Sequence, residues 1–320
     1  MTALSLWVIF VPHNHNHKRE RTILMTSPLY YIGIDGGGTK CRIILEDENG
    51  KLITSGLSGP ANIMRDCDTA ITSIIEAIDV AIENTGTKIS LSQCIVGAGL
   101  AGANVSIAAQ QFNQWQHPFK FLTLMSDLHA ACYGAHDGKD GAVIITGTGS
   151  SATCYLDDSF KDFGGHGFPI GDTASGAWLG LRAIEHTLHV LDGLKPKDVV
   201  SEAVLKHLNA DSTMQIVTLC ASYKPADFAS IVSSLIPLLH INEPFTVSLF
   251  QEGTHYIEQV ASKLLSNHTV SLALIGGLSE IYYAQLPKDI KSRVVTSKHS
   301  PEKGALLYAK QQFVAEEVSL

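Results

Sequence analysis

The sequence lacks three features: clustered cysteines, an excess of positive charge, and a long apolar run. The formal net charge is −8, which argues against nucleic acid as the main partner because binding to a phosphate backbone needs a basic face. No apolar stretch in the sequence is long enough to cross a bilayer. The scattered cysteines form no CxxC pair, so we expect reduced, buried thiols in a cytoplasmic protein, without a disulfide or zinc site. They are Cys41, Cys67, Cys94, Cys132, Cys154 and Cys220.

The composition and the patterning are those of a globular α/β protein. The 320 residues, with 45% apolar and 17% charged residues, are enough for two domains and a sizeable core. Stretches with strand character alternate with stretches of helical spacing, and a strand–turn–strand unit opens each half. This order predicts an α/β fold with mixed sheets. Helices are expected at 66–84, 105–115, 127–135, 178–191, 199–208, 226–239, 244–265 and 301–314.

Residues 30–40, YYIGIDGGGTK, join an apolar strand to an acid, three glycines and a hydroxyl. Asp35 stands where the strand ends and can reach a Mg²⁺, directly or through water. The glycines let backbone N–H groups approach a phosphate closely, and Thr39 adds a hydroxyl donor. The segment is not a Walker A loop, because a second strand follows and Asn49-Gly50 then makes a hairpin turn. It predicts a phosphate site in a β-hairpin, although three glycines alone are also typical of an ordinary turn.

A second copy of this arrangement favours the phosphate interpretation. Residues 141–146 (GAVIIT) form an apolar strand, residues 147–150 (GTGS) a small hydroxyl-rich turn, and residues 151–156 a returning strand. Two such turns about one domain apart are expected if two similar lobes hold one nucleotide. Residues 271–278 (SLALIGGL) add a strand that ends in a Gly-Gly pair, against which a base or ribose can lie.

A competing motif is present in residues 97–102, GAGLAG, which fits the GxGxxG pattern of a dinucleotide site. It follows a later strand, however, and not the first strand of an opening βαβ unit. A dinucleotide site would also leave both GGGT and GTGS unexplained. We therefore interpret residues 99–102 as a close-packed turn beside the ligand.

The motifs resemble, in order and across nearly the whole chain, the BadF/BadG/BcrA/BcrD-type ATPases of the actin/hexokinase/Hsp70 superfamily, and within them the N-acetylglucosamine and glucosamine kinases. The resemblance implies a two-lobe, actin-like (ribonuclease H-like) ATPase fold with an interlobe cleft. It also implies that the chain uses ATP and Mg²⁺ to phosphorylate the 6-hydroxyl of an amino sugar, and it is compatible with a homodimer. The matching segments are IDGGGT (34–39), SGPANIM (58–64), GAGLAG (97–102), Ser126-Asp127, GTGS (147–150), GGHGFPIGDTASG (164–176) and Gly276-Gly277.

The resemblance also implies roles for individual residues. Asp127 would be the catalytic base and would also contact the sugar, and Asp35 would hold Mg²⁺; the alternative for Asp127 is a helix N-cap only. The implied nucleotide-binding residues are Gly36, Gly37, Gly38, Thr39, Lys40, Gly147, Thr148, Gly149, Ser150, Gly276 and Gly277. The implied sugar-binding residues are Asn62, Asp127, Gly165, His166, Gly167 and Asp172.

Two of the sugar-binding assignments have alternatives. Asp172 could instead cap the helix that starts near Ser175, and His166 could be an ordinary surface residue in a turn. Relatives often carry Asp-Glu-Gly-Ser where this chain has Asp172-Thr173-Ala174-Ser175. The chain therefore lacks the glutamate, and keeps only Asp172 of that acidic pair.

The domain organisation follows from the same resemblance. We expect a disordered leader at 1–27 with Met25 as the true start, an N-terminal lobe of 28–140 plus 302–320, and a C-terminal lobe of 141–301. Two further functions fit the family: an ATPase that activates a partner dehydratase, and a sugar-sensing module. The first would carry clustered iron–sulfur cysteines, which this chain lacks. The second is disfavoured because the ATP turns and the candidate base are all present.

Overall fold

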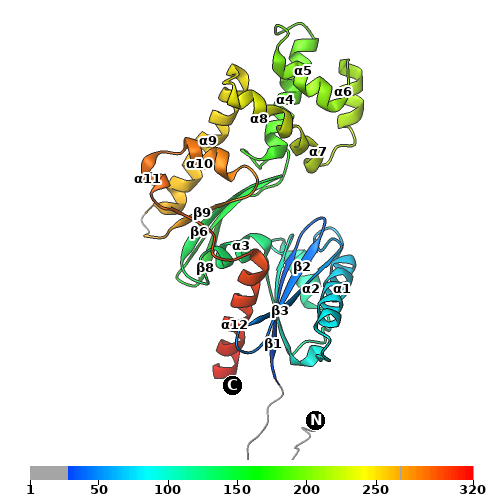
Figure 1. Ribbon diagram of the computed structural model, residues 1–320, viewed down its shortest axis with the longest axis vertical. Helices are drawn as coiled ribbons and strands as arrows, with labels where there is room; N and C mark the ends of the chain where they lie inside the picture. The colour runs from blue at the N-terminus through cyan, green and yellow to red at the C-terminus, as the bar shows by residue number, and fades with distance from the viewer. Residues whose placement is uncertain (1–27, 267–268, 320) are drawn as a thin grey trace, which may run out of the picture.

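The computed structural model describes residues 28–266 and 269–319. Over these residues the chain forms two five-stranded sheets, with strand orders β3-β2-β1-β4-β5 and β10-β9-β6-β7-β8. Each sheet contains antiparallel and parallel pairs, which confirms the predicted α/β fold with mixed sheets. In Figure 1 the first sheet lies in the lower half of the molecule, and the second sheet lies near mid-height and to the left, with helices above it. The expected leader lies outside the described residues.

The first sheet is built on the predicted hairpin. β1 (Tyr30–Gly36) pairs with β2 (Cys41–Glu46), and β2 pairs with β3 (Leu52–Ser58), all antiparallel. The turn before β3 forms because the Asp47 carboxylate accepts the N–H groups of Asn49 and Lys51, both at 2.9 Å, an Asx-type turn. β4 (Cys94–Leu100) and β5 (Phe121–Ser126) then add in parallel beyond β1.

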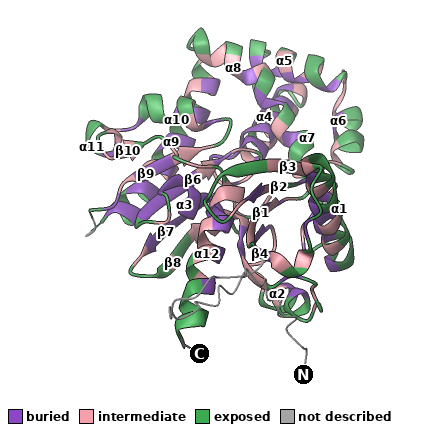
Figure 2. Cartoon of the chain, turned by 60° about the horizontal axis from the view of Figure 1, so that its bottom comes forward, coloured by how far each residue is buried: buried purple, intermediate pink, exposed green. Residues whose placement is uncertain are grey.

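The second sheet repeats this plan. β6 (Gly141–Thr146), β7 (Ser150–Leu156) and β8 (Ser159–Gly164) are antiparallel, and β9 (Leu272–Ile275) and β10 (Val294–Val295) add in parallel beyond β6. β8 is a strand that the sequence analysis did not predict. Its pattern of exposed and half-buried residues, SFKDFG, gives no apolar signal because it lies at the edge of its sheet. Figure 2 shows the contrast between buried β6 and β9 and the exposed edge strand β3.

Helices cover the first sheet on both faces. α1 (Cys67–Thr85) packs on β3 and β2, and a short η1 (Leu91–Gln93) precedes β4. α2 (Ser106–Asn113) lies beside α1. The last helix α12 (Pro301–Ser319) returns to pack on β1, β4 and the helix at Asp127–Ala135. α12 lies so close to β1 that a Cβ on Gly33 would be 1.9 Å from the carbonyl oxygen of Glu302. This close approach explains why the strand has a glycine at this position.

The helix α3 (Asp127–Ala135) occupies a special place, because it contacts strands of both sheets (Figure 1). A buried cluster that includes Met125, Val143 and Ala305 surrounds it. The segments that meet here come from three distant parts of the chain. The lobe limits predicted above, 28–140 with 302–320 and 141–301, stay a prediction.

The helices of the second half enclose the largest buried cluster. The helix expected at 226–239 is wrong as a single element: it is two helices, α7 and α8, because the N–H groups of Ile231 and Ser234 bond three residues back, and not four. α6 was not predicted, and few of its side chains are buried. The set is α4 (Gly176–Leu191), α5 (Val199–Leu208), α6 (Thr213–Cys220), α7 (Pro225–Ser230), α8 (Val232–His240), α9 (Pro244–Leu265), α10 (Ser279–Gln285) and α11 (Lys288–Lys291).

Five of the six cysteines are buried and Cys220 is half-buried. Burial raises the pKa of the Cys41 thiol to about 12, so this thiol is protonated at neutral pH. Among the described helices, none has both the length and the apolar character needed to span a membrane.

Candidate active site

The first glycine-rich turn joins β1 to β2. Gly36 lies within the sheet, where a Cβ would be 2.5 Å from Cδ2 of Leu100. The N–H of Gly37 donates to the carbonyl oxygen of Lys40 at 2.9 Å and closes the turn. Residues 38–40 form the exposed tip. Gly36 and Gly37 therefore shape the turn, and its tip is the part that is open to a ligand.

Three carboxyl groups gather where β1 ends: Asp35 on β1, Asp127 on α3 and Glu302 on α12. Burial, together with the negative charges of Glu302 and Asp127, raises the pKa of Asp35 to about 6. Burial also raises the pKa of Asp127, against the opposing effect of the Leu128 N–H, which donates to its Oδ1 at 2.9 Å. Oε2 of Glu302 is buried without a hydrogen-bond partner in the described part of the chain. Such a group of acids is stabilised by a cation.

The interpretation of Asp127 as an N-cap is wrong. Ser126 is the N-cap of α3, and its Oγ accepts the N–H of His129 at 3.1 Å. Asp127 is the first residue within the helix, so its carboxylate is not needed for capping. It stands at the carboxyl end of β5, at the point where α3 begins to pass between the two sheets.

Asn62 lies on the loop that follows β3. Its Oδ1 accepts the N–H groups of Met64 at 3.0 Å and Arg65 at 3.1 Å. The same loop is tied to the first turn, because the N–H of Ala61 donates to the carbonyl oxygen of Gly37 at 2.8 Å. The carbonyl side of the Asn62 amide is therefore used by the protein, and its amide nitrogen is the group with capacity left for a ligand.

Asp172 and His166 lie on the loop between β8 and α4. The N-cap interpretation of Asp172 is also wrong, because Ser175 caps α4 and accepts the N–H of Trp178 at 3.1 Å. Burial raises the pKa of Asp172, while the N–H of Gly167, at 3.2 Å from Oδ1, and nearby His166 act in the opposite direction. His166 is exposed on this loop, as are Gly165 and Gly167.

The second turn, residues 147–149, joins β6 to β7 and meets the start of α4. The carbonyl oxygens of Gly147 and Thr148 accept the N–H groups of Gly176 at 2.7 Å and Ala177 at 3.1 Å. A Cβ on Gly149 would lie 2.9 Å from Oδ2 of Asp172. This turn therefore adjoins one of the residues implied for the sugar.

The remaining nucleotide candidates differ in their access to a ligand. Ser150 is buried in β7, and its hydroxyl donates to the carbonyl oxygen of Thr173 at 2.7 Å. Gly276 approaches β6 so closely that a Cβ would lie 2.2 Å from the carbonyl oxygen of Thr146. A Cβ on Gly277 would have no other atom within 4 Å. Of the Gly-Gly pair, Gly277 therefore offers the open surface.

Two charged residues near the first turn were missed from the sequence. Arg65 directly follows the matched segment 58–64, and a Cβ on Gly38 would lie 3.8 Å from its Nη1. Glu302 is far from the other acids in sequence, and only the return of α12 brings it to Asp35. The sequence could have indicated Arg65, because it lies three residues after the candidate Asn62. No local pattern marks Glu302 as part of the site.

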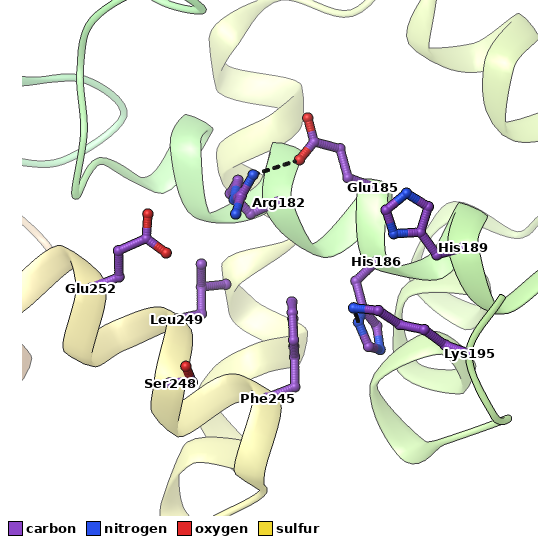
Figure 3. A pocket seen from close by; sticks show the side chains of 9 residues that line it. All are labelled: Arg182, Glu185, His186, His189, Lys195, Phe245, Ser248, Leu249 and Glu252. Carbon is purple, nitrogen blue, oxygen red and sulfur yellow. Dashed lines mark hydrogen bonds and ion pairs between the residues drawn. The ribbon is translucent and has the colours of Figure 1, made fainter.

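A separate hollow lies between α4 and α9 (Figure 3), and no residue of the glycine turns lines it. Its charged groups mostly satisfy one another. Arg182 pairs with Glu185 at 3.1 Å, and Nδ1 of His186 lies 3.1 Å from Nζ of Lys195. Nε2 of His186 lies 2.6 Å from Oδ2 of Asp198. This hollow contains none of the residues predicted for the site.

Comparison with known proteins then decides the family. The model of the BadF/BadG/BcrA/BcrD ATPase family matches residues 32–309. The chain belongs to this family. It is 33% identical to glucosamine kinase GspK of Vibrio cholerae over 281 residues, which are 88% of this chain and 95% of that protein. It is 28% identical to the N-acetylmuramic acid/N-acetylglucosamine kinase of Clostridium acetobutylicum over 198 residues, or 59% and 63% of the two chains.

Solved structures of similar proteins agree on the fold. A Chromobacterium violaceum protein provisionally named as an N-acetylglucosamine kinase superposes with a TM-score of 0.82 at 29% identity, covering 88% of this chain and 99% of that one. A ROK family glucokinase from Streptomyces griseus, solved with glucose and AMPPNP, superposes with a TM-score of 0.52 at 15% identity, covering 88% and 98%. The predicted two-lobe, actin-like ATPase fold of this family member is thereby confirmed.

Proposed function

We propose that this protein is an ATP-dependent kinase that phosphorylates the 6-hydroxyl of an amino sugar, with glucosamine as the first candidate substrate. The observation that carries the proposal is the group formed by Asp127, Asp35 and the first glycine turn. A carboxylate that is not needed as a cap stands beside a turn suited to phosphate, close enough to Asp35 to raise its pKa. The relative that is 33% identical over most of both chains is a glucosamine kinase.

In the proposed reaction Asp127 is the base. Its carboxylate takes the proton of the 6-hydroxyl as that oxygen attacks the γ-phosphorus of ATP, and the bond to the bridging oxygen of ADP breaks. Burial raises the pKa of Asp127, which brings the carboxylate nearer to the pH at which it must accept a proton. Because phosphoryl transfer depends mainly on positioning and charge neutralisation, the other residues hold and orient the substrates.

Asp35 is the residue that we assign to Mg²⁺. The fit rests on the acids around it: Glu302 and Asp127 both add to the pKa shift of Asp35, and oxygen donors of this kind suit Mg²⁺. When bound, Mg²⁺ supplies positive charge to the phosphate oxygens. Residues 38–40 and 147–149 would surround the phosphates, and Gly277 would lie against the adenosine.

Asn62, Asp172 and the loop 165–167 are the residues that we assign to the sugar. The amide nitrogen of Asn62 can donate to a hydroxyl, and the Asp172 carboxylate can accept from one. His166 is placed next to Asp172 on an exposed loop, which suits contact with the substituent at carbon 2. The choice between an amine and an acetamide at that carbon stays a prediction, as do the homodimer and the cytoplasmic location.

The test is ATP consumption by the purified protein with glucosamine, with N-acetylglucosamine, and without sugar. We expect fast turnover with glucosamine and slow hydrolysis without it, with product identified as the 6-phosphate by NMR. Hydrolysis that is equally fast without sugar would favour an ATPase that activates a partner. Sugar binding without any phosphorylation would favour a sensing module.

A further inference from the structure

Arg65 is a cation at the first glycine turn that none of the assignments above uses. It is exposed and directly precedes Asp66, the N-cap of α1. A Cβ on Gly38 would lie 3.8 Å from Nη1 of Arg65, so the guanidinium stands over the exposed tip of the turn. Within residues 28–266 and 269–319 its guanidinium has no ion pair or hydrogen bond with another side chain. Its charge is therefore available to a ligand.

The backbone of this arginine is held firmly. Its N–H donates to Oδ1 of Asn62 at 3.1 Å and lies 3.2 Å from the Asn62 carbonyl oxygen. The loop is fixed on one side by the bond from Ala61 to Gly37, and on the other by the N–H of Ile63, which donates to the carbonyl oxygen of Ala101 at 3.1 Å. A long side chain on a fixed backbone, beside a turn suited to phosphate, is arranged to meet a ligand with little reorganisation.

The charges around the site explain why a cation is needed there. Asp35, Asp127 and Glu302 are all acids. Burial raises the pKa of both aspartates, and the charges of Glu302 and Asp127 raise that of Asp35 further. ATP brings further negative charge. On the phosphate turn itself the sequence supplies Lys40 as a cation, and Arg65 adds a planar group with several N–H donors, which matches phosphate oxygens in pairs.

We propose that Arg65 binds the γ-phosphate of ATP and stays with that group as it moves to the sugar. The inference rests on the proposed kinase function, and it assigns Arg65 as a further catalytic residue. Arg65 takes no part in making or breaking bonds. It stabilises the charge that spreads over the three outer oxygens of the transferred group while Asp127 takes the proton.

The experiment compares nucleotides that differ in the γ-phosphate. Calorimetry with Mg²⁺ present measures the affinities of ADP and of AMPPNP for the intact protein and for Arg65→Gln, Arg65→Lys and Arg182→Gln. The last variant removes a guanidinium that pairs with Glu185 at the hollow between α4 and α9. Arg65→Gln should weaken AMPPNP roughly ten- to hundredfold and leave ADP nearly unchanged, as expected for loss of a charge-assisted hydrogen bond. Arg65→Lys should recover part of the affinity, and Arg182→Gln should match the intact protein.

Turnover adds a second readout. With glucosamine, kcat of Arg65→Gln should fall by about 10²- to 10³-fold, as when one preorganised donor is removed from a transition state, while KM for the sugar stays close to that of the intact protein. Equal weakening of ADP and AMPPNP, or no weakening of either, would overturn the assignment of Arg65 to the γ-phosphate. Absence of sugar phosphorylation by the intact protein would refute the kinase function instead, and the nucleotide comparison would still decide the role of Arg65.

Discussion

The attachment of α12 to the first sheet gives a prediction about stability. Glu46 on β2 is 3% exposed, and it accepts hydrogen bonds from Lys303 and from Lys310, the latter with Nζ at 3.2 Å from Oε2. Both lysines belong to α12, the helix that carries Glu302 to Asp35. Glu46 therefore links the last helix to the second strand, and through that helix it supports the acidic group at the site.

Replacing Glu46 by Gln keeps the shape of the side chain and removes its charge. One lysine can still donate to the amide oxygen, while the other faces the amide NH₂ group, which cannot accept a hydrogen bond. The loss of one charge-assisted hydrogen bond corresponds to about 1.5–3 kcal/mol in the free energy of unfolding. Because both lysines are partly exposed, water offsets part of this loss, and we expect about 2 kcal/mol.

Urea unfolding followed by circular dichroism measures this change. Glu48→Gln is the matched control, because Glu48 is an exposed acid in the turn that follows β2, and surface substitutions usually change stability by no more than about 0.5 kcal/mol. A Glu46→Gln variant as stable as Glu48→Gln would show that the two lysines contribute nothing to the attachment of α12. The structural argument for this contact would then be refuted.

Three further predictions concern the metal, acid stability and lobe closure. Asp35→Ala should weaken the binding of Mg²⁺–AMPPNP in calorimetry while glucosamine binding stays near that of the intact protein; unchanged nucleotide affinity would remove Asp35 from the site. Burial would raise the pKa of Asp198, but hydrogen bonds from Ser201 and His186 outweigh burial and lower it below its ordinary value of 3.8. A carboxyl with a lowered folded-state pKa stabilises the fold above that ordinary value and loses this effect as pH falls through the folded-state pKa. Asp198→Asn should therefore reduce the melting temperature more at pH 6 than at pH 3. An equal reduction at both pH values would show that the charge of Asp198 does not stabilise the fold. Amino sugar should decrease the radius of gyration in small-angle scattering, because the candidate groups come from both halves of the chain; an unchanged radius would argue against closure.

Much of the fold could be predicted from local patterns. The hairpin at Asn49-Gly50, the buried strand at 141–146 and the helix α5 follow from turn chemistry and apolar periodicity. Residues 99–100 were interpreted as part of a turn, but they belong to the buried strand β4. The edge strand β8 could not be predicted, because none of its residues is buried and its sequence has no regular apolar face. α7 and α8 appeared as one helix because the residues around Ile231 keep helical spacing, while the backbone N–H groups of Ile231 and Ser234 bond three residues back.

The candidate site was predicted less completely than the fold. The motif segments identified Asp35, Asp127 and Asp172, but spacing alone could not show that Ser126 and Ser175 supply the helix caps. Nor could the sequence show why residues 36 and 276 are glycines. At both positions a Cβ would come too close to neighbouring backbone or side-chain atoms. Such facts depend on distances between segments that are far apart in the chain, and so does the meeting of Glu302 with Asp35.

The central claim is that Asp127 takes the proton of a sugar hydroxyl during transfer from ATP. Single-turnover transfer of the γ-phosphoryl group from radiolabelled ATP to glucosamine tests it most directly, in the intact protein and in Asp127→Asn, with glucosamine affinity measured in parallel. We expect the intact protein to form the sugar phosphate. In Asp127→Asn the transfer should be slower by about 10²- to 10⁴-fold, the usual contribution of a general base, while sugar affinity is largely kept. Transfer at a normal rate in the variant would show that Asp127 is not the base.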